Sequence, residues 1–60
     1  MKEVANFVRQ RMVMLEEYRA GFDRVAKETG MSRKERKDGI KYYDVRIEEC
    51  RSILTFVESR

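Results

Sequence analysis

The chain has 60 residues, a formal net charge of +3, and hydrophobic and charged fractions of 42% each, which excludes more than one small domain and argues against full disorder. Cys50 is the single cysteine and histidine is absent, so the chain cannot close a disulfide on itself and has too few ligands for zinc. Its longest apolar run, residues 12–15, is far below the about 20 residues that span a bilayer, and the N-terminus does not resemble a signal peptide. We expect a soluble, cytoplasmic protein.

The first half of the chain has the pattern of an amphipathic helix, which we expect over residues 2–28. With Met1 at heptad position a, apolar residues recur at positions a, d and e. They are Met1, Val8, Leu15 and Phe22 at a, Val4, Tyr18 and Val25 at d, and Ala5, Met12 and Ala26 at e. Arg11 at d and Arg19 at e interrupt the pattern, and we expect their guanidinium groups to stay in water.

A tight turn is predicted at residues 29–32. Gly30 suits the left-handed conformation just past a helix end, where a Cβ would clash. Ser32 followed by Glu35 forms a capping-box pattern, which is typical of a helix start. A helix stop and a helix start this close together predict a helical hairpin.

The second helix is expected over residues 33–59. Its apolar stripe is Ile40, Tyr43, Ile47, Cys50, Leu54 and Val57, with an unbroken 3-4 spacing. Gly39 makes room for Phe22 if the helix is continuous, and the alternative is a break of the helix at Asp38–Gly39. Antiparallel helices joined here place residue i opposite about 61 − i, so Leu54 meets Val8, Ile47 meets Leu15 and Val57 meets Val4.

Several large apolar residues fall outside these stripes, and four of them belong to the end of the hairpin away from the turn: Phe7, Met14, Ile53 and Phe56. Two helices cannot bury so wide an apolar surface against each other. We therefore expect an all-α fold, a two-helix antiparallel hairpin in one domain over residues 1–60, which dimerises into a four-helix bundle. A different protein partner could cover the same residues, and isolated exposed apolar residues are also normal. In length and architecture the chain resembles plasmid copy-number regulators that are dimers of helical hairpins and bind RNA, without a shared residue motif.

No constellation of side chains indicates catalysis. The acidic pairs 16–17 and 48–49 lack the histidines of a di-metal bundle site and fall at solvent positions. Cys50 has no histidine to act as a base and fits the apolar stripe, so we expect a core residue. We expect no enzyme activity, no metal, no cofactor and no small-molecule substrate.

The basic residues gather around the turn. Residues 24–41 hold seven basic and three acidic residues, a net charge of +4 that leaves −1 for the rest of the chain. Cations in the first turn of a helix oppose its dipole, so a sequence selected for stability alone would place acids there. We identify a candidate anion-binding or partner-binding set, Arg33, Lys34, Arg36, Lys37 and Lys41. The alternative is a solvated basic turn that aids solubility.

These features favour a small non-enzymatic protein–protein interaction module, a regulator, inhibitor or adaptor of a larger protein. Its composition is compatible with a phage or mobile-element regulator. The alternative function is a dimeric nucleic-acid-binding hairpin that uses the basic tip at residues 33–41. Aromatic residues do not alternate with the cations over residues 32–39, which weakens that alternative. A membrane-surface helix is disfavoured because the two apolar stripes already match each other.

Overall fold

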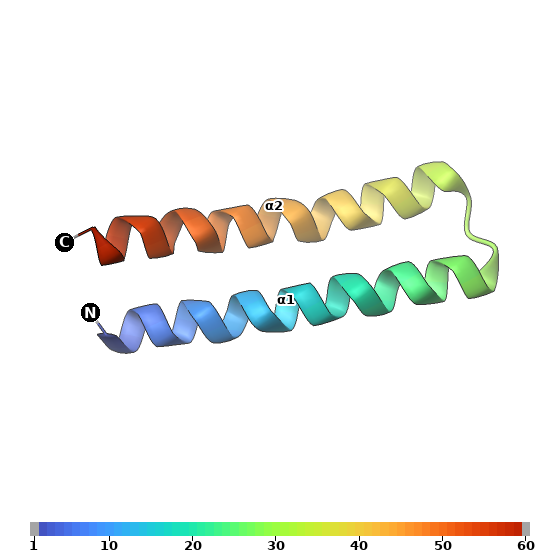
Figure 1. The fold of residues 1–60 in the computed structure, drawn as a ribbon. Coiled ribbons are helices and arrows are strands. Elements are labelled where there is room, and N and C mark those ends of the chain that lie inside the picture. Colours follow the sequence, from blue (N-terminus) through green and yellow to red (C-terminus); the bar gives the residue numbers. More distant parts are fainter. Residues whose placement is uncertain (1, 60) are drawn as a thin grey trace.

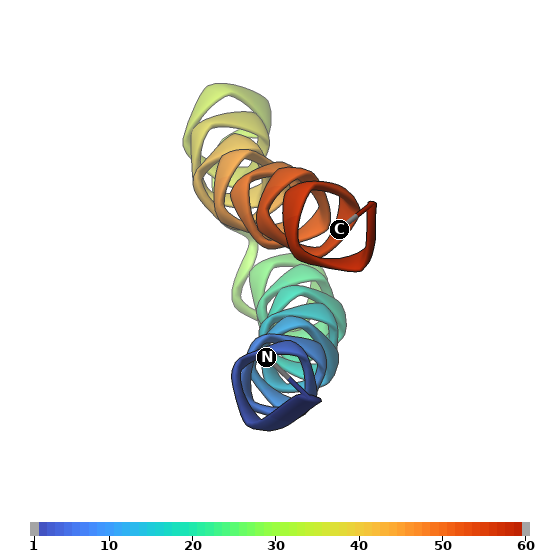
Figure 2. The ribbon, with the colours of Figure 1, turned by 90° about the vertical axis from the view of Figure 1, so that its left-hand side faces the viewer.

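A computed structural model describes residues 2–59, and these form two antiparallel helices side by side (Figure 1). Helix α1 runs from Lys2 to Thr29 and helix α2 from Arg33 to Glu58, which confirms both expected helices to within one residue at each end. Met1, which we placed at heptad position a, lies outside the described residues. The Cα atoms extend over 45 × 16 × 9 Å, so the hairpin is one helix thick (Figure 2).

The turn forms as its residues predict. Gly30 has a φ of 69°, and the Met31 N–H donates to the Ala26 carbonyl oxygen at 3.0 Å, which together make a glycine-terminated helix end. Ser32 caps α2, because its Oγ accepts a hydrogen bond from the Glu35 N–H at 3.2 Å. This is one of the two bonds of a capping box, and the return bond from the Glu35 side chain is not found among the described residues.

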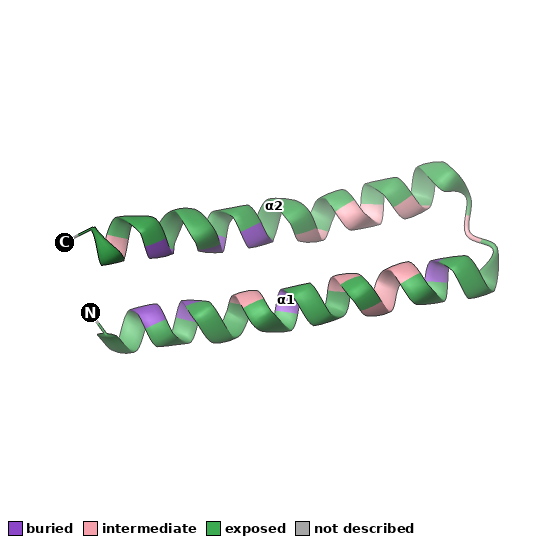
Figure 3. Cartoon of the chain, viewed as in Figure 1, coloured by how far each residue is buried: buried purple, intermediate pink, exposed green. Residues whose placement is uncertain are grey.

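The core is a narrow seam between the two helices (Figure 3). Its buried members are Ala5, Val8 and Leu15 of α1 and Ile47, Cys50 and Leu54 of α2, with Met12, Tyr43 and Val57 partly buried against them. Cys50 is therefore a core residue, as expected. Except for small Ala26, which is 1% exposed, the buried residues keep 6–8% of their surface accessible. The seam thus stabilises the hairpin with little fully buried apolar surface.

One sequence-based expectation about this seam is wrong. Heptad positions a and e of α1 face α2, but the d-position residues Val4, Tyr18 and Val25 are exposed. The apolar stripe on α2 occupies only two heptad positions, so it cannot cover three heptad positions of α1 at once. The small Ala5 and Ala26 at position e let the helices approach on that side, which turns the d positions away.

Helix α2 continues through Gly39, which decides between the two alternatives for this residue. A Cβ built at Gly39 would lie within 2.5 Å of Phe22 Cε1, so the absence of a side chain makes room for the ring. Phe22 also contacts Tyr43, with ring centroids 6.0 Å apart. Within the described residues, no helix is both long and apolar enough to cross a membrane.

We predict that Gly39→Ala destabilises the hairpin despite the higher helix propensity of alanine. The new methyl group must displace the Phe22 ring, and overpacking of this kind costs about 1–3 kcal/mol. Chemical denaturation of wild type, Gly39→Ala, Phe22→Leu and the double variant forms a double-mutant cycle. The loss of unfolding free energy from Gly39→Ala should be smaller in the Phe22→Leu background, and an equal loss in both backgrounds contradicts the steric explanation.

Candidate interaction surface

One side of the hairpin is polar and is held by ion pairs between the helices. Arg9 Nη2 lies 2.7 Å from Glu58 Oε1, and Arg19 Nε lies 2.6 Å from Asp44 Oδ1. Near the turn, the guanidinium of Arg36 contacts Asp23 Oδ1 through Nε at 2.8 Å and Nη2 at 2.7 Å. Arg9 and Asp23 are two heptads apart on α1, and Asp44 and Glu58 are two heptads apart on α2, so the pairs line up along one side. We call it the ion-paired side.

The opposite side of the hairpin is apolar and exposed, and we call it the apolar face. Its α1 residues follow one another at a 3-4 spacing interrupted by Arg11 and Gly21, and its α2 residues flank Arg46 and Glu49. The apolar face consists of Val4, Phe7, Met14, Tyr18 and Val25 of α1 and of Tyr42, Ile53 and Phe56 of α2. Their exposed fractions run from 43% for Met14 to 68% for Phe7. Both helices therefore leave an apolar stripe in contact with solvent.

A groove between the helices shows that the two stripes share one side. Arg11, Met14 and Tyr18 line it from α1, and Tyr42 and Arg46 line it from α2. The Arg46 guanidinium carbon lies 4.0 Å from the centroid of the Tyr42 ring, a cation–π contact that covers part of the ring. Tyr42 in turn packs edge-on against Tyr43, with centroids 5.4 Å apart. The middle of the apolar face is thus ordered by aromatic contacts within α2.

The four residues predicted as an interface all keep substantial exposure. Phe7 and Met14 lie on the α1 part of the apolar face, and Ile53 and Phe56 lie on the α2 part. Sequence reasoning missed Val4, Tyr18 and Val25, which it had assigned to the seam. The signal was present in the sequence, because residues 4, 7, 11, 14, 18, 21 and 25 form a second stripe with regular 3-4 spacing.

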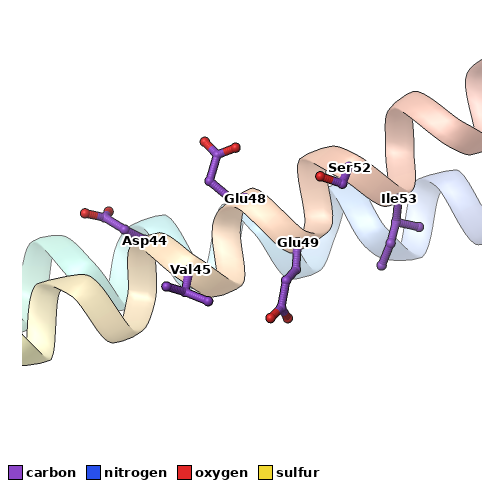
Figure 4. Close-up of a pocket in the computed structure, with 6 residues that line it drawn as sticks. All are labelled: Asp44, Val45, Glu48, Glu49, Ser52 and Ile53. Carbon is purple, nitrogen blue, oxygen red and sulfur yellow. The ribbon is translucent and has the colours of Figure 1, made fainter.

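The outer surface of α2 is a second place where apolar and acidic side chains mix. Asp44, Val45, Glu48, Glu49, Ser52 and Ile53 line a shallow hollow there (Figure 4). Figure 4 shows Glu49 and Ile53 pointing to one side of the helix, whereas Asp44 and Glu48 point to the other. Side chains that diverge in this way do not converge on a common point. Within residues 2–59, no three or more His, Cys, Asp or Glu side chains are placed so that they could hold a metal ion together.

The basic tip, residues 33–41, is only partly available for binding. Arg36 is partly buried and contacts Asp23, so it does not project freely into solvent. The other four predicted residues, Arg33, Lys34, Lys37 and Lys41, are exposed and have no ion-pair partner in the part of the chain that the structure describes. Arg33, Arg36, Lys37 and Ile40 line a shallow hollow beside the turn.

The ionic contacts of Asp23 change its acidity. The hydrogen bond from Arg36 lowers the pKa of the Asp23 carboxyl below its usual value of 3.8, and Lys27, at 3.4 Å, lowers this pKa further. Partial desolvation acts in the opposite direction but does not outweigh the two cations. Asp23 therefore stays ionised to lower pH in the folded chain than in the unfolded chain.

Comparisons of the chain with protein-family models, curated proteins and solved structures find no match.

We predict that the stability contributed by Asp23 is fully present above about pH 4 and is lost as the pH falls through the lowered folded pKa. Asp23→Asn should therefore be less stable than wild type at pH 7, and the difference should shrink below pH 3.8. Thermal melts at about pH 7, 5 and 3 measure this. Asp38→Asn is the control, because Asp38 has no ion pair among the described residues, and an Asp23 effect that is independent of pH contradicts the assignment.

Proposed function

We propose that this protein is a small non-enzymatic interaction module that forms a homodimer, a four-helix bundle, and acts as a regulator, inhibitor or adaptor of a larger protein. The observation that supports this proposal is the apolar face. Eight large apolar residues on one side of the hairpin keep at least 43% of their surface exposed, opposite a side with three interhelical ion pairs. Contiguous apolar surface with polar borders is typical of interaction sites.

The accessible surface area of the hairpin supports the proposal that a second chain covers this face. The chain exposes 5000 Å², whereas a folded monomer of 7.3 kDa exposes about 4200 Å² by the general scaling of area with mass. The excess, roughly 800 Å², is what one partner loses in an interface of standard size. A homodimer in which the apolar faces meet would remove this excess from both chains.

The shape of the hairpin supports the same arrangement. Its radius of gyration is 14.0 Å, compared with about 10.4 Å for a compact 60-residue domain and about 13.6 Å for one of 120 residues. A second hairpin would thicken the 9 Å dimension without adding to the length. Globular domains have two packed layers around a core, and this hairpin supplies one layer.

We predict that wild type is dimeric at micromolar concentration and that Phe7→Ser/Ile53→Ser is monomeric. Each of these side chains, when fully buried, contributes about 1.5–3 kcal/mol to the free energy of association. Removing two from each chain therefore raises the dissociation constant of the dimer by several orders of magnitude. Light scattering coupled to gel filtration measures the mass.

Val13→Ser/Val45→Ser is the matched control. It also replaces two exposed apolar residues per chain, but both lie at the border of the apolar face, where Val45 lines a hollow with Ile53 and Val13 lines one with Met14. This variant should remain dimeric. A monodisperse wild-type particle of 7.3 kDa at micromolar concentration overturns the homodimer.

A second candidate function, nucleic-acid binding by the basic tip, is favoured by the four exposed cations Arg33, Lys34, Lys37 and Lys41. Phosphate groups attract such a cluster, and their counterions are released on binding. Tyrosine side chains that could stack with bases lie elsewhere, on the apolar face and at its base. The proposed contact is therefore electrostatic and independent of base sequence.

We predict that any nucleic-acid affinity falls steeply with salt and is abolished by Arg33→Glu/Lys37→Glu. The same variant should be more stable thermally, because an acid at position 33, in the first turn of α2, suits the helix dipole by about 0.3–1 kcal/mol. Fluorescence anisotropy with a labelled oligonucleotide at several salt concentrations measures the affinity. Lys2→Glu/Arg51→Glu, with the same charge change at the other end, is the control, and affinity that survives in Arg33→Glu/Lys37→Glu excludes this site.

A further inference from the structure

The apolar face contains charged residues whose placement indicates how a second copy would dock. Arg11 of α1 and Glu49 of α2 are both exposed and have no ion-pair partner within residues 2–59. Each interrupts the apolar stripe of its own helix. A charge within an apolar interface needs an opposite charge, because burial without a pair is strongly unfavourable.

Arg11 and Glu49 lie at nearly the same height along the hairpin. Phe22 faces Gly39, which places residue i of α1 beside about residue 61 − i of α2. The ion pairs Arg19–Asp44 and Asp23–Arg36 each depart from this relation by two residues, in opposite directions. By this relation Arg11 lies level with Cys50, one residue from Glu49, and Phe7 lies level with Leu54, next to Ile53.

Two ways of stacking the apolar faces are compatible with two-fold symmetry, and they bring different residues together. If the two-fold axis runs along the helices, both turns lie at one end and α1 of each copy lies on α2 of the other at equal height. Arg11 then meets Glu49, and Phe7 meets Ile53. If the axis runs across the helices, α1 lies on α1 and α2 lies on α2, and Arg46 near the middle of α2 meets Arg46 of the second copy.

Charge complementarity favours the first arrangement. It forms two Arg11–Glu49 pairs per dimer, whereas the second places like charges together near the symmetry axis. Repulsion between the two basic turns at one end is reduced by the placement of their lysines. Lys34, Lys37 and Lys41 recur at a 3-4 spacing that leads to Asp44, so they lie toward the ion-paired side and away from the contact.

We propose that a second copy of this chain covers the apolar face in the parallel orientation, with Arg11 of each copy paired to Glu49 of the other. This inference rests on the proposed homodimer and specifies its geometry. It also places the two basic tips at one end of the bundle, where the cations of the two chains lie on opposite outer surfaces.

Two charge-reversal variants test the orientation. Arg11→Glu alone brings two carboxylates together at each of these contacts in its homodimer, and Glu49→Arg alone brings two guanidinium groups together there. Each variant should dimerise at least about tenfold more weakly than wild type, because like charges meet in the interface. Mixed together, the two variants form opposite-charge pairs at both contacts, so native mass spectrometry should show the heterodimer well above the statistical half of all dimers.

The control is the pair Arg24→Glu and Glu48→Arg, which carry the same charge changes on outer surfaces. Their mixture should stay at the statistical half, which separates local pairing from general attraction between oppositely charged chains. Heterodimer at or below one half in the Arg11→Glu and Glu49→Arg mixture, or no dimer at all there, overturns the parallel orientation. A monomeric wild type instead overturns the homodimer itself.

A distance measurement tests the same geometry without reversing charges. A spin label at Thr29→Cys, in a Cys50→Ala background, marks the turn of each copy. In the parallel dimer the two labels lie at one end of the bundle, at less than half the 45 Å length of the hairpin. Pulsed electron paramagnetic resonance that instead gives a distance close to the full length overturns the parallel orientation.

Discussion

The contact between two helices is narrow, and the rest of this structure depends on that constraint. A helix covers only a limited arc of its neighbour, so the seam of α1 and α2 holds positions a and e of α1 against a two-position stripe of α2. Helix α1 has three apolar positions in its heptad and a fourth, position g, occupied by Phe7 and Met14. What the seam does not cover becomes the apolar face.

The ion pairs determine which side remains polar. Three of them cross between the helices on the side of Arg9, Arg19 and Asp23. Exposed pairs of this kind contribute only about 0–1 kcal/mol each, so the stability of the hairpin does not rest on them. Their effect is orientational, because they favour the rotation of α1 that brings position e toward α2 and turns position d away. The hairpin thus has two unlike sides, and only one of them resembles an interaction surface.

The turn links this geometry to the basic tip. Gly30 and Ser32 end one helix and begin the next within three residues, so the cations at the start of α2 lie beside the end of α1. There Asp23 engages Arg36 and lies 3.4 Å from Lys27. Part of the positive charge near the turn is therefore paired with Asp23, which connects the two helices there, and the other cations stay exposed. A function that requires cations would use these exposed cations of the basic tip.

The sequence by itself determined the features that depend on neighbours within one turn of helix. The two helices, the glycine stop, the Ser32 cap and the α2 stripe all follow from local backbone chemistry and from 3-4 spacing. The sequence also placed Gly39 opposite Phe22, but only the structure decided that α2 continues through Gly39. Only the tertiary structure decided which apolar positions of α1 are buried, and that Arg36 binds Asp23. Both outcomes depend on how one helix is rotated against the other. Small Ala5 and Ala26 and the distant acids of α2 set this rotation together. The periodicity of a single helix carries no information about it.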